Sequence, residues 1–154
     1  MSVVIKEKII EIKQSAKAEV KPKIDKQGRA YATGKRKNAV AKVWIKKGTG
    51  KINVNDLEAL PYFGREILFN VVNAPLKITK NDNKFDVIAQ IIGGGKSGQA
   101  GALAHGISKA LVAFDHGNHQ TLRSLGFLTR DSRVVEPKKY GFKKARKGKT
   151  YRKR

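Results

Sequence analysis

The sequence predicts an α+β domain, in which two helices cover one face of a small mixed sheet, followed by an extended basic C-terminal tail. Runs rich in β-branched residues at 39–46, 51–55 and 84–92 have the composition and partial alternation of strands. Apolar residues recur at helical spacing over 62–73 and 100–114. Two strands come first, then helix, strand and helix, an order typical of helices packed on one side of a mixed sheet.

The first two strands are expected to pair as a hairpin. The run at 39–46 reads AVAKVWIK, and Gly48, Thr49 and Gly50 supply a tight turn into the second run. Trp44 is expected to lie in the core or on a half-buried sheet face, in preference to serving as a base-stacking platform. The sequence therefore predicts neighbouring strands on either side of this turn.

Prolines and glycines set the expected limits of the two helices. Pro61 suits the first turn of the earlier helix, Pro75 is expected to stop it, and Gly117 is placed to end the later helix. The earlier helix is expected to share one apolar face among Phe63, Ile67, Leu68 and Val71. The later helix carries the clearest periodicity, at Ala100, Leu103, Ala104, Ile107, Ala110, Leu111 and Phe114.

The composition bounds the size and class of the protein. The chain has 154 residues and a formal net charge of +22 at pH 7, enough for one modest domain with appendages. It has no cysteine, which excludes a disulfide scaffold, a zinc knuckle and a thiol enzyme. No apolar run is long enough to span a bilayer, and charged residues interrupt the N-terminal apolar positions too early for a signal peptide. We expect a soluble protein that is not exported.

Three parts are expected along the chain. Residues 1–28 form an N-terminal extension whose apolar positions have the spacing of a short amphipathic helix. A polar segment at 21–27 links it to a globular domain over 29–128, and residues 129–154 form the extended basic tail.

The tail is the most strongly charged part of the chain. Residues 134–154 hold ten Lys or Arg against one acid, Glu136, with too few aliphatic side chains to fold alone. Tyr140, Phe142 and Tyr151 stand between the charges, and aromatic rings can stack on unpaired bases while the cations meet phosphates. The tail is therefore predicted to bind nucleic acid. The alternative, a solubilising tail, is weaker because Lys and Arg improve solubility less than acids do.

A glycine run, Gly93-Gly94-Gly95-Lys96-Ser97, lies between a predicted strand and a predicted helix, as a phosphate-binding loop would. The nucleotide-binding pattern needs a further glycine where this chain has Gln90, so nucleotide hydrolysis is not expected. Backbone N–H groups and Lys96 could still meet a phosphate of a nucleic-acid backbone. A flexible turn with a packing role is an equal alternative.

Two further clusters hold residue types that could bind a ligand. Residues 33–38 are expected to form a turn that presents Lys35, Arg36 and Lys37 together as a clamp for backbone phosphates, with a solvated charge run as the alternative. His116 and His119 lack the spacing of a metal site and are expected to be solvated. No Ser, His and Asp arrangement or carboxylate pair has the spacing of a catalytic site.

Several blocks of the sequence resemble a known family. They comprise Tyr31, Gly34, Arg36, Lys37, Ala39, Ala41 and Val43; Gly48, Gly50, Ile52, Val54 and Asn55; Gly93 to Gly95, Gly98 to Ala102, Gly106 and Ile107; and Thr129 to Asp131, Arg133, Glu136, Lys138, Lys139, Gly141, Lys144 to Arg146, Lys153 and Arg154. In this order they are similar to the ninth protein of the small ribosomal subunit, bacterial type, over about 29–154. Two departures are Pro137, where a basic residue is usual, and Arg152, where serine is common.

The resemblance implies a fold and a set of partners. It implies a domain like the second domain of ribosomal protein five, seated on small-subunit ribosomal RNA in the subunit head beside neighbouring head proteins. It also implies a tail that reaches the anticodon stem-loop of the peptidyl-site tRNA. No enzyme activity, cofactor or membrane contact is implied. The implied location is the cytoplasmic bacterial ribosome, in preference to an organellar matrix.

The residues expected to carry these contacts are basic or aromatic. Those expected to bind ribosomal RNA are Lys35, Arg36, Lys37, Lys96, Arg130, Arg133, Lys138, Lys139, Lys143, Lys144 and Arg146. Those expected to contact tRNA are Tyr151, Arg152, Lys153 and Arg154. Two rival classes remain at this point, a DNA-compacting architectural protein and a P-loop enzyme, the latter weakened by Gln90.

Overall fold

A computed structural model describes residues 24–151; the expected N-terminal helix and the last three residues lie outside this range. Its five strands are β1 (Ala30–Arg36), β2 (Ala39–Lys47), β3 (Ile52–Val54), β4 (Leu57–Glu58) and β5 (Phe85–Ile92). Its helices are α2 (Ala59–Phe63), α3 (Glu66–Ile78), α4 (Lys96–Phe114) and α5 (Asn118–Ser124). The sheet order is β1-β2-β5-β3-β4, antiparallel except that β3 runs parallel to β5.

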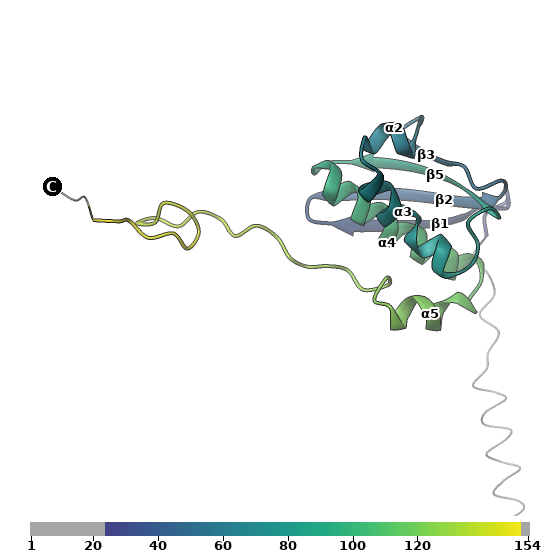
Figure 1. Ribbon diagram of the computed structural model, residues 1–154. Helices are drawn as coiled ribbons and strands as arrows, with labels where there is room; N and C mark the ends of the chain where they lie inside the picture. The colour runs from purple at the N-terminus through teal and green to yellow at the C-terminus, as the bar shows by residue number, and fades with distance from the viewer. Residues whose placement is uncertain (1–23, 152–154) are drawn as a thin grey trace, which may run out of the picture.

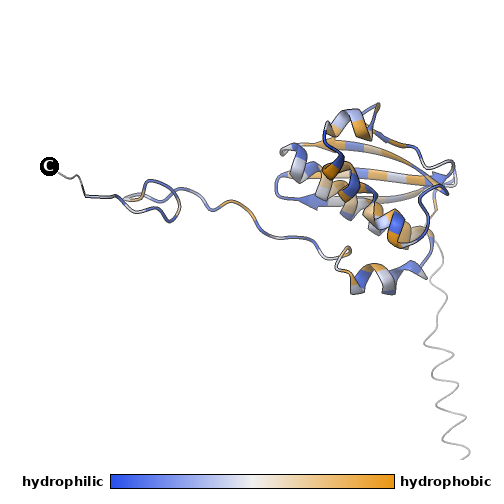
Figure 2. Ribbon diagram, in the orientation of Figure 1, coloured by the Kyte–Doolittle hydropathy of each residue, from blue (hydrophilic) through white to orange (hydrophobic). Residues whose placement is uncertain are grey.

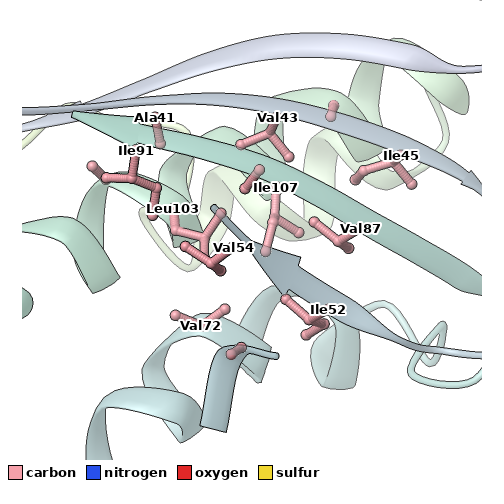
Figure 3. Close-up of a cluster of buried hydrophobic side chains, with 14 of the residues drawn as sticks. Ala41, Val43, Ile45, Ile52, Val54, Val72, Val87, Ile91, Leu103 and Ile107 are labelled. Carbon is pink, nitrogen blue, oxygen red and sulfur yellow. The ribbon is translucent and has the colours of Figure 1, made fainter. Parts of the chain in front are cut away.

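Helices lie on one face of this sheet, so the predicted α+β class is confirmed (Figure 1). Alternate residues of β1, β2 and β5 are buried toward the helices, and the residues between them face away. Figure 3 shows α4's Leu103 and Ile107 and α3's Val72 in one cluster with the sheet residues Val43 and Val54. All five side chains are fully buried, and this core holds the sheet and helices together.

The closest approach between sheet and helix occurs at two glycines. A Cβ added to Gly34 in β1 would collide with the carbonyl oxygen of Ala102 and the backbone nitrogen of Gly106 in α4. A Cβ added to Gly106 would lie 2.6 Å from Cγ2 of Val43. Strand and helix backbones therefore touch directly, and these positions have no room for a side chain.

The expected turn at 33–38 is wrong, because its first residues belong to β1. Thr33 to Arg36 pair with β2, and only Lys37 and Asn38 lie in the turn. Lys37 has a positive φ of 51°. A glycine such as Gly34 is typical of a loop. Here it lies in a strand, because the backbone of α4 leaves no room for a side chain at this position.

The expected hairpin between 39–46 and 51–55 is also wrong. β2 pairs with β1 and β5, and β5 separates it from β3. The connecting segment passes over the start of β5, where one carboxylate oxygen of Asp86 accepts backbone hydrogen bonds from Thr49 at 2.7 Å, Gly50 at 3.0 Å and Lys51 at 3.2 Å. The hydrogen bond from Thr49 is the main reason that the pKa of Asp86 is lowered. Asp86 therefore holds the segment that crosses from β2 to β3. Gly48 and Gly50 in this segment are typical of a hairpin turn, which is why the sequence predicted one.

The earlier predicted helix is two helices. Gly64 has a positive φ of 66° and separates α2 from α3. Pro75 does not stop α3, because the helix continues to Ile78, where Thr79 Oγ1 donates to the carbonyl oxygen of Pro75. The predicted apolar face is confirmed in part, because Phe63 is buried and Leu68 packs against the core, whereas Ile67 is 76% exposed. The buried residues of α3 are Val72, Pro75 and Leu76.

The later predicted helix and the predicted strand at 84–92 are confirmed as α4 and β5. α4 begins at Lys96, four residues earlier than the apolar periodicity indicated. Gly117 does not end α4, since the helix is capped at Asp115 and Gly117 instead precedes α5. His119 thus lies in a helix, with its ring stacked on His116 at 5.2 Å between centroids.

Candidate nucleic-acid interface

The chain leaves the domain as an extended segment. After α5, Phe127 and Leu128 still pack against the core, and no helix or strand follows in the described part of the tail. Figure 1 shows this segment running away from the domain, and Figure 2 shows it mostly blue to white apart from a short orange stretch. Few apolar side chains hold it, so its arrangement depends on polar contacts and on partners.

A charged joint fixes the root of the tail. Arg36, at the end of β1, donates to Oδ2 of Asp131 at 3.3 Å, and Arg133 donates to both oxygens of that carboxylate at 3.0 and 2.9 Å. The Arg36 side chain lies across Gly101 of α4, where a Cβ would be 2.6 Å from Nη1. The hydrogen bonds from Arg133 hold the pKa of Asp131 well below its usual range. Arg36, expected on a phosphate, therefore links β1, α4 and the tail.

His105 of α4 makes a second connection at the same place. Its Nδ1 accepts a hydrogen bond from the Lys35 backbone N–H at 3.3 Å, and its Nε2 lies 3.3 Å from the carbonyl oxygen of Leu128. This pairing requires the neutral ring with its proton on Nε2. Burial lowers the pKa of His105, and the positive charges of Lys109 and Arg130 lower it further.

Acid should destabilise the domain through His105. Because the folded-state pKa is lowered, the unfolded chain binds more protons, so stability is complete above about pH 6.5 and is lost as the pH falls through the folded-state pKa. Thermal unfolding between pH 8 and pH 5 measures this. We expect His105→Gln to unfold at a lower temperature at neutral pH but with a flatter pH profile. His116→Gln, at an exposed position, should keep the wild-type acid sensitivity; equal slopes for all three proteins would contradict this role of His105.

Lys96 is turned back onto the protein. Its ammonium donates to the carbonyl oxygen of Tyr62 at 2.9 Å and lies 3.6 Å from the centre of the Tyr62 ring. Tyr62 also donates from its hydroxyl to Gln99 of α4 at 3.0 Å. Lys96 therefore joins α2 to α4. The glycines before it pack on the start of β2, since an added Cβ would lie 2.6 Å from the carbonyl oxygen of Asn38 at Gly93 and 3.0 Å from Cβ of Ala39 at Gly94.

The distal tail forms a loop through an ion pair. Arg146 donates to both carboxylate oxygens of Glu136, at 2.8 and 3.0 Å, and these bonds lower the pKa of Glu136. Lys143 donates to the Thr150 hydroxyl at 3.3 Å. Both contacts are exposed and contribute little to stability in water, so a polyanion can replace them.

The remaining predicted contact residues are exposed along two regions. Lys35 and Lys37 lie at the β1–β2 end of the sheet, while Arg130 and the rest follow the tail. The exposed tail residues of this set are Arg130, Lys138, Lys139, Lys144 and Tyr151. Arg152, Lys153 and Arg154 lie outside the described residues. The predicted residues do not converge on one pocket but form a path from the domain outward.

Two residues at the joint were not among the predicted contacts. Asp131 is an acid between Arg130 and Arg133 in a basic segment, and that isolation was the available signal. His105 gave no signal, because its partners lie 70 and 23 residues away along the chain.

Comparison with protein families settles what kind of chain carries this architecture. The family model described as ribosomal protein S9/S16 matches residues 34–154. The chain belongs to the ribosomal protein S9/S16 family. The match takes in nearly the whole domain, the charged joint and the complete basic tail.

Membership of the S9/S16 family implies a role in the ribosome. The protein is a structural constituent of the small ribosomal subunit and binds ribosomal RNA. It is not an enzyme, so the glycine run before α4 does not serve nucleotide hydrolysis. Within residues 24–151, no helix is both long and apolar enough to cross a membrane.

Proposed function

We propose that this S9/S16 chain anchors its domain on ribosomal RNA and delivers the end of its tail to the anticodon stem-loop of the peptidyl-site tRNA. The observation that carries the proposal is the extended, densely cationic segment that leaves the domain at Asp131 (Figure 1). Its likeness to the bacterial-type family supports a bacterial ribosome in the cytoplasm as the setting.

The length and charge of the tail support separate roles for the domain and the tail. A domain of about 100 residues has a radius of gyration near 13 Å, whereas 21 extended residues reach up to roughly 70 Å. The tail is therefore long enough to carry its end well beyond the domain, and phosphates along the route supply the ordering free energy that its sequence lacks.

We assign the RNA contacts according to exposure. In this proposal both the domain of residues 29–128 and the tail of residues 129–154 contact ribosomal RNA. The primary contacts are made by exposed cations, namely Lys35, Lys37, Arg130, Lys138, Lys139 and Lys144. Arg133, Lys143 and Arg146 reach phosphates by exchanging their protein partners for RNA. Arg36 and Lys96 hold the tail root and the α2–α4 contact.

Deleting Lys153 and Arg154 should weaken tRNA retention in the peptidyl site. The loss of one or two charged phosphate contacts predicts a cost of about 1 to 3 kcal/mol at low salt, and less at high salt. The domain should fold and the subunit should assemble, because two charged side chains offer almost no apolar surface to bury. Filter binding of tRNA to reconstituted subunits measures the effect.

Matched variants separate charge from reach. Replacing both residues by alanine should mimic the deletion, whereas Lys153→Arg with Arg154→Lys should be nearly silent. If truncated and wild-type subunits hold peptidyl-site tRNA equally well at low salt, the tail anchors ribosomal RNA only and the tRNA proposal fails.

A further inference from the structure

The sheet has a second face, which no described element covers (Figure 1). Tyr31, Trp44 and Ile88 occupy facing positions on β1, β2 and β5 and form one row across three strands. The Tyr31 and Trp44 rings lie 5.3 Å apart between centroids with a 40° tilt, and Tyr31 and Ile88 are 43% and 40% exposed. An aromatic and aliphatic row of this kind is normally buried when nothing binds it.

Cations lie on both sides of this row. On one side Lys42 faces Thr33 and Gln90, so no acid stands opposite it on the neighbouring strands. On the other side Lys46 faces Asp86, whose carboxylate already accepts the hydrogen bonds from Thr49, Gly50 and Lys51. Both lysines are exposed. Successive rows are about 7 Å apart, two residues along a strand, so each lysine is adjacent to the rings.

We propose that this open sheet face is a binding surface for unpaired nucleotides of the small-subunit ribosomal RNA. Bases stack on Tyr31 and Trp44, and Lys42 and Lys46 meet the phosphates on either side. A duplex would need only the cations and would leave the ring row exposed, and an apolar protein partner would have to bury Lys42, which has no acid opposite it. The inference rests on the RNA-binding role of the chain, and it is independent of the tRNA contact proposed for the tail.

The chain provides its own reporter for this surface. Trp44 is its single tryptophan, so selectively excited tryptophan emission comes from the row itself. We would titrate the full chain with a short single-stranded oligouridylate and, separately, with inorganic polyphosphate, which offers charge without bases. The oligouridylate should quench Trp44, whereas polyphosphate should bind the cationic tail and leave the emission unchanged.

Matched variants test the two parts of the surface. Tyr31→Ala should weaken the oligouridylate affinity measured by Trp44 quenching by roughly 5- to 150-fold, the range for one lost base–aromatic stack, and Tyr31→Phe should keep it. Lys42→Gln should weaken the same affinity, while Lys47→Gln should not. Lys47 is on the same strand but faces the helices, 5.9 Å from the centre of the Phe114 ring, so both variants lose one charge from β2.

Several results would overturn the proposal. Quenching by polyphosphate equal to that by oligouridylate would mean that the rings do not meet bases. Oligouridylate binding that leaves Trp44 unchanged would mean that the face is covered in the full chain or is not used. A change in Trp44 emission with protein concentration alone, and none with RNA, would assign the face to self-association. Deletion of Lys153 and Arg154 should leave the quenching intact, so this test and the tRNA test fail separately.

Discussion

Replacing Gly34 by alanine should lower the free energy of unfolding by about 3 kcal/mol, at the upper end of overpacking effects, because the new methyl group meets backbone atoms that no side-chain rotation can move. The carbonyl of Ala102 and the amide nitrogen of Gly106 belong to the middle of α4, so the strand and the helix must separate. Such a loss corresponds to a fall in Tm of at least roughly 10 °C for a domain of this size. Thermal unfolding followed by circular dichroism measures it.

A second glycine is the control for this result. Gly148 lies in the tail, has no atom within 4 Å of an added Cβ and has no positive φ, so Gly148→Ala should leave the Tm unchanged. If Gly34→Ala unfolded at the wild-type temperature, β1 and α4 would not be in backbone contact and the described packing would be wrong.

Affinity of the full chain for ribosomal RNA should fall by roughly a thousandfold or more between 50 and 200 mM salt. Contacts to six or more phosphates release that many counterions, and the exposed cations of β1, the β1–β2 turn and the tail are sufficient in number. Binding to a labelled small-subunit RNA fragment at several salt concentrations gives the slope of the logarithmic plot.

Both the tail and the domain should contribute to the slope of this salt dependence. A chain ending at Arg133 keeps the Arg36–Asp131 contact and loses ten Lys or Arg, so its slope should be clearly shallower than that of the full chain. Equal slopes would mean that the tail cations do not contact phosphates. A flat profile for the full chain would contradict the electrostatic basis of its RNA binding.

The elements predicted correctly are those whose apolar residues repeat within one continuous segment of the chain. β5 and α4 were predicted because their apolar residues repeat at the period of a strand over 84–92 and of a helix over 100–114. β1 was missed because its alternation runs through Thr33 and Gly34, and the reason for that glycine lies about 70 residues away in α4. The sheet order was misjudged for a similar reason, since β5 enters between β2 and β3 from a distant part of the chain.

The same distinction holds for the RNA-binding surface. Exposed cations in the tail could be predicted from composition, because nothing in that segment could bury them. The contact between Arg36 and Asp131 could not be predicted, because the two residues are 95 positions apart and only the fold brings them together. The row on the open sheet face has the same origin, as Tyr31 and Trp44 become neighbours through strand register and not through proximity in sequence.

The contacts that α4 makes with β1 also cover polar backbone groups at one edge of the sheet. β1 is the outermost strand of its side of the sheet, and an outer strand with free polar groups recruits strands from other molecules. Here the Lys35 N–H is taken by His105, the Thr33 carbonyl oxygen accepts a hydrogen bond from Lys109 at 3.2 Å, and Ile24 bridges to Ala30. His105 and Lys109 stand one turn apart on α4 and so block the strand at two successive positions. A newly made chain that has not yet met its RNA therefore presents a β1 edge that is blocked at these positions, which hinders strand-to-strand aggregation along β1 before ribosome assembly.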